Sequence, residues 1–193
     1  MRGTDAVDRH LADSLTGLEV EALAGADRIA DLGAGAGFPG LALAVALPDT
    51  DVDLIESTER KCEVIARLAR AAGAPNARAV PERAEDWAAG EGREAYAAVT
   101  ARALAPLAVI AEYAAPLLRE GGVLVAWKGS RDEEEEQRGA AAAEQLGLGD
   151  PEVIRVEPFE GAANRHLHVF TKTGPTPEGF PRRAGMARKR PLK

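Results

Sequence analysis

A glycine-rich loop after the first short apolar segment restricts the possible folds more than any other feature of this chain. Residues 28–32 predict a strand, and the loop that follows reads Gly33-Ala34-Gly35-Ala36-Gly37-Phe38-Pro39-Gly40. Three glycines at alternate positions permit positive φ angles and let backbone amides approach a ligand closely. A helix is expected next, over 39–47. The order strand, glycine loop, helix indicates an α/β protein with a ligand site at the loop.

Strands alternate with helices along the rest of the chain. The expected strands are 28–32, 52–55, 76–80, 96–100, 123–127, 153–157 and 166–172. The expected helices are 7–23 (within a helical region 5–24), 39–47, 58–72, 106–118 and 131–146, and the pair Gly121-Gly122 is expected to turn the chain into its fifth strand. This alternation predicts a mostly parallel seven-stranded sheet with helices on both faces. The last two strands have no helix between them, which predicts an antiparallel hairpin at the sheet edge.

The net charge of −7 conceals a basic C-terminus. Six of the last twelve residues are Lys or Arg and none is acidic, whereas the rest of the chain is strongly acidic. We expect residues 1–173 to form one domain, followed over 174–193 by a Pro/Gly linker and a basic tail. A cationic tail on an acidic body suits contact with nucleic acid, and it suits a solvent-exposed end equally well.

Several classes of protein are disfavoured by what the sequence lacks. No stretch approaches the roughly 20 apolar residues of a membrane span, and the start has no apolar core of a signal peptide. Cys62 is the only cysteine, so no internal disulfide is possible, and one cysteine with three histidines disfavours a structural metal site. We therefore expect a cytoplasmic protein without a metal and without a membrane partner.

Two classes of ligand use glycine loops of this kind. A dinucleotide requires G-x-G-x-x-G and an acid about 20 residues further on, and Gly35 to Gly40 with Glu56 match that spacing formally. S-adenosylmethionine suits a loop in which an acid ends the first strand, glycines alternate, and an acid ends the second strand. That pattern fits Asp31, Gly33, Gly35, Gly37 and Glu56. Because this ligand carries an ammonium and a sulfonium but no phosphate, the acids favour S-adenosylmethionine.

Motifs more specific than the glycines extend along the whole chain. They are Arg9-His10-Leu11-Ala12-Asp13-Ser14, the loop ending in Phe38-Pro39-Gly40, Glu56-Ser57, Arg83-Ala84-Glu85-Asp86, Thr100-Ala101-Arg102-Ala103-Leu104-Ala105-Pro106-Leu107, Trp127-Lys128-Gly129, and the end segments 180–185 and 189–192. With these motifs the chain resembles the RsmG family, also called glucose-inhibited division protein B (GidB), the bacterial small-subunit ribosomal RNA guanine-N7 methyltransferases.

The resemblance implies a class I S-adenosylmethionine-dependent methyltransferase of Rossmann-like fold, acting on N7 of a guanine in 16S rRNA or in the small ribosomal subunit. It places cofactor contacts at Gly33, Phe38, Ala84, Glu85 and Arg102, with Glu56 as the acid after the second strand. Guanine N7 carries a lone pair and no proton, so its methylation depends on positioning and electrostatics rather than on a general base. We expect Arg102 to border both the cofactor and the guanine.

Contacts to RNA are expected from basic residues on the rim of this site and in the tail. The candidates are His10, Lys128, Arg182, Arg183, Arg188, Lys189 and Arg190. For His10 the more ordinary interpretation is a hydrogen-bonded pair with Asp13 one helical turn away. His166 and His168 are interpreted as residues on one face of the last strand rather than as metal ligands.

One departure from the family pattern keeps alternatives open. Only eight residues precede Arg9, where relatives have a longer helical segment. A protein that binds S-adenosylmethionine but is inactive is therefore one alternative, and an NAD-dependent oxidoreductase, based on the formal spacing Gly35 to Gly40, is the other. We expect a monomer, since no exposed leucine stripe is evident.

Overall fold

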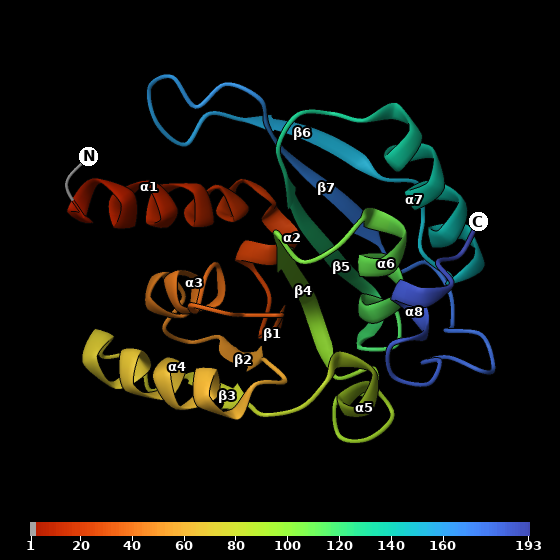
Figure 1. The fold of residues 1–193 in the computed structure, drawn as a ribbon, viewed down its shortest axis with the longest axis horizontal. Coiled ribbons are helices and arrows are strands. Elements are labelled where there is room, and N and C mark those ends of the chain that lie inside the picture. The colour runs from red at the N-terminus through yellow and green to blue at the C-terminus, as the bar shows by residue number, and fades with distance from the viewer. Residues whose placement is uncertain (1–2) are drawn as a thin grey trace.

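The computed structural model describes residues 3–193, and seven strands form one sheet at its centre (Figure 1). The strands are β1 (Arg28–Leu32), β2 (Asp51–Ile55), β3 (Ala77–Val80), β4 (Tyr96–Arg102), β5 (Leu118–Lys128), β6 (Glu152–Val156) and β7 (Arg165–Thr171). They lie in the order β3-β2-β1-β4-β5-β7-β6. Only β7 runs antiparallel to its neighbours β5 and β6. The predicted mostly parallel seven-stranded sheet with an antiparallel edge hairpin is confirmed.

Helices cover both faces of this sheet (Figure 1). They are α1 (Gly3–Leu15), the 3-10 helix η1 (Thr16–Glu19), α2 (Glu21–Ala24), α3 (Gly40–Ala46), α4 (Glu59–Ala72), α5 (Ala84–Ala88), α6 (Leu107–Ala114), α7 (Glu133–Gln145) and α8 (Met186–Lys189). Alternate residues of β5 point to two separate cores: Val125 packs in the core that includes residues of α3 and α4, and Leu124 in the core that includes residues of α6 and α7.

The strand order reverses at β1, which has β2 on one side and β4 on the other. In parallel sheets a ligand site forms beyond the carboxyl ends of the strands at such a reversal. The glycine loop follows β1 directly, so the fold places it at this point.

The helix expected over 5–24 is wrong as a single element, because the chain leaves α1 at Leu15 and passes through η1 before α2. The cause is Trp127 on β5, whose indole nitrogen donates to the Asp13 carbonyl at 2.8 Å and to Thr16 Oγ1 at 3.1 Å. A Cβ at Gly17 would lie 2.6 Å from the Trp127 ring. The turn at Gly17 therefore makes room for the indole.

The expected turn into the fifth strand is also wrong. The helix predicted over 106–118 ends at Ala114, and β5 begins at Leu118 and runs through Gly121 and Gly122. Gly121 has φ +79°, and the register between β4 and β5 shifts between Tyr96 and Ala98. The two glycines thus form an irregularity inside a long strand rather than a turn before a short one.

The N-terminal helix exposes an apolar stripe, contrary to the expectation from the sequence. Val7, Leu11 and Leu15 lie one helical turn apart and are 49%, 37% and 37% exposed. The stated reason for expecting a monomer is therefore wrong, and the oligomeric state stays a prediction. No helix among residues 3–193 is long and apolar enough to cross a membrane.

The residues after β7 pack onto the domain instead of extending from it. Ala187 of α8 is 1% exposed and belongs to the core that contains α6. Lys172 at the end of β7 is buried and donates to the Leu146 carbonyl at 2.7 Å and to Thr176 Oγ1 at 2.8 Å. Figure 1 shows α8 beside α6, with the C-terminus near α7.

Candidate functional site

Two cavities open beyond the carboxyl ends of the central strands and meet at Ala103, which lines both. The first, called here the loop cavity, has a volume of about 450 Å³, and its walls include Gly33, Glu56, Ala84, Glu85 and Leu104. The second, called here the arginine cavity, has a volume of about 520 Å³ and is lined by Arg9, His10, Asp13, Arg102, Trp127, Lys128, Phe159 and Arg165. The fold thus assembles a two-part site from the segments that carry the sequence motifs.

The conformation of the glycine loop requires glycine at defined positions. Gly33, Gly35 and Gly37 have φ angles of +64°, +55° and +94°. A Cβ at Gly33 would lie 2.5 Å from Leu104, and one at Gly37 would lie 2.4 Å from Leu41. Side chains at positions 33 and 37 would therefore clash with neighbouring leucines, and of the three glycines only Gly33 lines a cavity.

Asp31, expected near the cofactor, lies beneath the loop. Its side chain is fully buried, with Oδ1 accepting from the Thr100 hydroxyl at 2.8 Å and Oδ2 accepting from the Gly40 amide at 3.0 Å. Burial raises the pKa of Asp31 to about 7, against the opposing effect of these two hydrogen bonds. The carboxyl thus joins β1, β4 and the start of α3, and it does not line either cavity. Because Asp31 is buried beneath the loop, its charge does not disfavour a pyrophosphate in the cavity, contrary to the expectation.

Glu56 lies in the wall of the loop cavity and is only 6% exposed. Its Oε1 accepts from the Thr58 amide at 2.9 Å and its Oε2 from the Gly35 amide at 3.2 Å. Burial opposes ionisation, but the Thr58 hydrogen bonds and the Lys61 charge outweigh it and hold the pKa of Glu56 below its ordinary value. An ionised carboxylate, held against the loop, fits a ligand that offers ribose hydroxyls and positive charge.

Ala84 and Glu85 begin the short helix α5 and face the same cavity. Glu85 is 8% exposed, and its Oε1 accepts from the Gly185 amide at 2.7 Å. A carboxylate offers about four acceptor positions, so Glu85 can accept from a ligand amine as well. The buried charged groups of this cavity are thus carboxylates, and the residues present fit S-adenosylmethionine.

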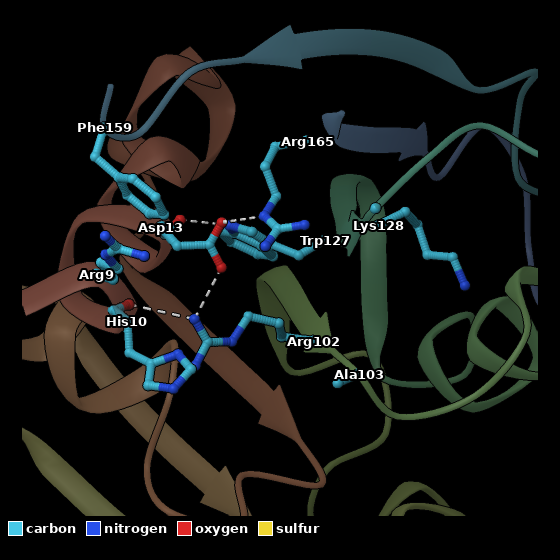
Figure 2. Close-up of a pocket in the computed structure, with 10 residues that line it drawn as sticks. Arg9, His10, Asp13, Arg102, Ala103, Trp127, Lys128, Phe159 and Arg165 are labelled. Atoms are coloured by element: carbon cyan, nitrogen blue, oxygen red, sulfur yellow. Dashed lines mark hydrogen bonds and ion pairs between the residues drawn. The ribbon is translucent and has the colours of Figure 1, made fainter. Parts of the chain in front are cut away.

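Arg102 lines the arginine cavity rather than the loop cavity. Its Nη1 donates to the His10 carbonyl at 3.2 Å, to Asp13 Oδ2 at 3.0 Å and to Ser14 Oγ at 3.2 Å. Figure 2 shows Asp13 between Arg102 and Arg165, and the Arg165 Nε lies 3.6 Å from Asp13 Oδ1. The expected pairing of Asp13 with His10 is wrong, because Asp13 pairs with the two arginines.

Aromatic rings fix other groups of the arginine cavity. Phe38 of the glycine loop lies with its ring centroid 5.9 Å from the His10 ring and 5.4 Å from the Arg102 Cζ. Arg9 lies over the Phe159 ring at 5.1 Å (Figure 2). Phe38 thus links the glycine loop to two residues of the arginine cavity, although Phe38, an expected cofactor contact, lines neither cavity itself.

Four residues that line this cavity had no predicted role. Arg9 and Trp127 belong to motifs of the family, whereas Phe159 lies in the connection between β6 and β7 and Arg165 begins β7. Nothing in their local sequence marks them. Only the pairing of β7 with β5 brings this connection to the site.

Some of the expected RNA-binding residues are paired within the protein, and others are exposed to solvent. Lys128 donates to Glu135 at 2.6 Å, and Arg182 forms a two-pronged ion pair with the buried Glu112. Arg188 lines the loop cavity and donates to the Leu104 carbonyl at 3.0 Å. Of the predicted RNA-binding residues, the exposed ones are His10, Arg183, Arg188, Lys189 and Arg190.

The two histidines of β7 have partners within the protein. His168 is 2% exposed and its Nε2 lies 3.1 Å from Glu136 Oε1, while His166 Nδ1 lies 2.9 Å from the Gly129 carbonyl oxygen. Over the described part of the chain, no group of three or more histidine, cysteine or acidic residues could hold a metal ion.

Comparison with known families gives a match over most of the chain. The family model described as rRNA small subunit methyltransferase G (GidB) matches residues 3–166. The methyltransferase G of Pelotomaculum thermopropionicum is 42% identical over 186 residues, which are 95% of this chain and 77% of that protein. The methyltransferase G of Deinococcus radiodurans is 42% identical over 193 residues, covering 97% of this chain and 75% of that protein.

Two solved structures that share this fold are described as O-methyltransferases. An S-adenosylmethionine-dependent O-methyltransferase from Thermotoga maritima superposes with a TM-score of 0.64 at 17% identity, covering 86% of this chain and 66% of that one. A predicted O-methyltransferase from Agrobacterium tumefaciens gives a TM-score of 0.63 at 26% identity, covering 86% and 81%. These neighbours support the class I methyltransferase fold over the dinucleotide-binding alternative.

Proposed function

The chain belongs to the rRNA small subunit methyltransferase G family, and we propose that it methylates N7 of a guanine in 16S rRNA with S-adenosylmethionine as methyl donor. The observation that carries the proposal is the junction of the two cavities at Ala103. Buried carboxylates in one cavity suit a cationic cofactor, and the arginines of the other suit a polyanionic substrate. Methylation of small-subunit rRNA follows from membership of the family.

The loop cavity holds the cofactor in this proposal. The glycine loop offers close approach, Glu56 accepts from the ribose hydroxyls, and Glu85 accepts from the adenine amine. When bound, the cofactor would supply the methyl group of its sulfonium to the N7 lone pair and would leave as a neutral thioether, with the positive charge passing to the guanine. All other work falls to the side chains of the protein, which orient the base and exclude water.

The arginine cavity receives the guanine. Guanine N7 has no proton to remove, so the rate depends on an in-line approach held by the surrounding side chains. Arg102 donates to the O6 side of the base and leaves N7 unbonded, while the Asp13 contact and the Phe38 ring keep its guanidinium in place. A group held by a partly buried ion pair requires little reorganisation when the substrate arrives.

The RNA strand outside the cavity is bound through its phosphates. Arg9 and Arg165 lie at the cavity, and Arg183, Lys189 and Arg190 are exposed on the C-terminal residues. Such contacts supply affinity but little sequence information. Recognition of one guanine therefore depends on the shape of folded RNA, naked or within the small subunit. We propose a monomeric enzyme acting in the cytoplasm.

Nucleoside mass spectrometry tests the reaction directly. Unmodified 16S rRNA and intact small subunits are each incubated with the purified protein and labelled S-adenosylmethionine. We expect labelled 7-methylguanosine from at least one of them. Measurable binding of S-adenosylhomocysteine without any 7-methylguanosine would contradict the proposal and leave an inactive cofactor-binding protein.

The role of Arg102 has its own test. Arg102→Ala should lower kcat/KM for the RNA by more than tenfold, or about 1.4 kcal/mol. A loss within about threefold, or about 0.7 kcal/mol, would show that Arg102 does not position the base.

A further inference from the structure

The residues 180–190, called here the C-terminal segment, lie against α6 next to the loop cavity. Ala187 is 1% exposed and belongs to the core. The Arg182 guanidinium donates to both carboxylate oxygens of Glu112, with Nε 2.6 Å from Oε1. Glu112 is on α6 and is 3% exposed. A buried carboxylate paired in this way fixes its partner, because separating them would leave an unpaired charge in the interior. The C-terminal segment is thus attached to the domain at defined points.

Two residues of this segment form part of the wall of the loop cavity. Gly185 and Arg188 line it together with residues that follow the first four strands. The Gly185 amide donates to Glu85 Oε1 at 2.7 Å, and Arg188 Nη2 donates to the Leu104 carbonyl at 3.0 Å. Gly185 has φ +81°, a conformation that other residues rarely adopt. The segment therefore contacts Glu85 and the loop after β4, both of which line the cavity.

The segment also carries exposed positive charge. Arg183, Lys189 and Arg190 are exposed and lie within a few residues of Gly185 and Arg188. One short piece of chain thus carries both cavity-lining groups and exposed cations.

We propose that the C-terminal segment is an element of the cofactor site that links cofactor binding to RNA binding. The Gly185 amide fixes the Glu85 carboxylate, and Arg188 closes the cavity beside the adenosine end of the cofactor. The exposed cations bind RNA phosphates, so that bound RNA holds the segment in its docked position. By reciprocity, RNA tightens cofactor binding by the same factor as cofactor tightens RNA binding. This inference rests on the proposed function for the identity of both ligands.

The first test measures S-adenosylhomocysteine binding by calorimetry without RNA. Arg188→Ala should weaken binding at least fivefold, and the matched control Arg67→Ala, at an exposed position of α4 that lines neither cavity, should stay within twofold of wild type. Arg182→Ala, which removes the anchor on Glu112 without touching the cavity, should also weaken binding. Melting temperatures of the ligand-free variants confirm that they fold. Unchanged binding in both Arg188→Ala and Arg182→Ala would overturn the proposal.

The second test measures the link itself. Hydrogen exchange of amides 180–190 in the wild-type protein should slow on addition of S-adenosylhomocysteine. Adding unmodified 16S rRNA should tighten S-adenosylhomocysteine binding in wild type, and should not in the triple variant R183A/K189A/R190A. Equal tightening in both proteins would exclude the coupling.

The two proposals fail in different ways. Loss of cofactor affinity in Arg188→Ala together with no methylation by the wild type would contradict the proposed reaction and leave the role of the segment standing. Suppose instead that the wild type methylates RNA and that Arg188→Ala and Arg182→Ala leave the cofactor affinity unchanged. That result would contradict the role of the segment and leave the proposed reaction standing.

Discussion

Asp13 on α1 and Arg102 at the end of β4 form an ion pair of 3.0 Å between residues that are 89 positions apart in the sequence. The other oxygen of Asp13 faces the Arg165 guanidinium at 3.6 Å. A single carboxylate thus lies between two arginines of the same cavity. It can set the direction of both guanidinium groups toward the substrate.

Asp13→Asn should reduce methylation because the amide keeps the shape of the side chain but loses the charge that holds both arginines. We expect kcat/KM for the RNA to fall about tenfold, or about 1.4 kcal/mol, while the dissociation constant of S-adenosylhomocysteine stays within twofold. The exposed Asp8 on the same helix supplies the control Asp8→Asn. A loss below threefold, or an equal loss of cofactor affinity, would contradict a positioning role.

Gly17→Ala should destabilise the protein by about 2 kcal/mol, since overpacking a filled site has a cost of this order. The added Cβ would lie 2.6 Å from the Trp127 ring. Gly25→Ala is the matched control, because the nearest atom to its Cβ is the Glu21 carbonyl oxygen at 3.4 Å. Urea unfolding of the two variants measures the difference. Equal stabilities would show that the indole does not determine the break after α1.

Asp31→Asn should change the pH dependence of stability. The pKa of Asp31 is raised by burial to about 7, against about 3.9 in an unfolded chain. The folded protein therefore holds this proton more tightly. The stabilisation it contributes is complete below about pH 4 and is lost as the pH rises through 7.

Asparagine has no proton to lose. The free energy of unfolding of the variant, measured relative to that of wild type, should therefore be about 1–3 kcal/mol higher at pH 8 than at pH 5. Urea unfolding at both pH values checks this. Asp51→Asn, at an exposed position at the start of β2, should show the same difference from wild type at both pH values. A pH-independent effect of Asp31→Asn would mean that the buried carboxyl is ionised throughout.

Arg9→Ala should weaken RNA binding chiefly at low salt. Loss of one phosphate contact lowers the slope of log K against log salt concentration by about 0.7–0.9. Filter binding of 16S rRNA between low and physiological salt measures the slope. The exposed Arg60 on α4, which lines neither cavity, supplies the control Arg60→Ala. An identical slope in Arg9→Ala and wild type would place Arg9 outside the RNA contact.

Much of the architecture could be predicted because it depends on local patterns. The apolar segments, the glycine loop after β1 and the acid after β2 can each be recognised from a few consecutive residues. The alternation of strands with helices then implies a parallel sheet. The positions of Gly33, Glu56, Ala84 and Glu85 around one cavity follow from that topology, since the carboxyl ends of parallel strands share one edge of the sheet.

The sequence by itself thus determined the sheet, the loop and the family of the chain. Only the tertiary structure decided that Asp31 is buried under the loop, that Asp13 joins Arg102 and Arg165, and that the basic tail folds back onto α6. These outcomes depend on contacts between distant segments, whose partners no local pattern specifies. The role of a charged residue in particular cannot be read from the sequence. Arg182 forms an ion pair with the buried Glu112, whereas its neighbour Arg183 is exposed to solvent, because only Arg182 lies within reach of Glu112.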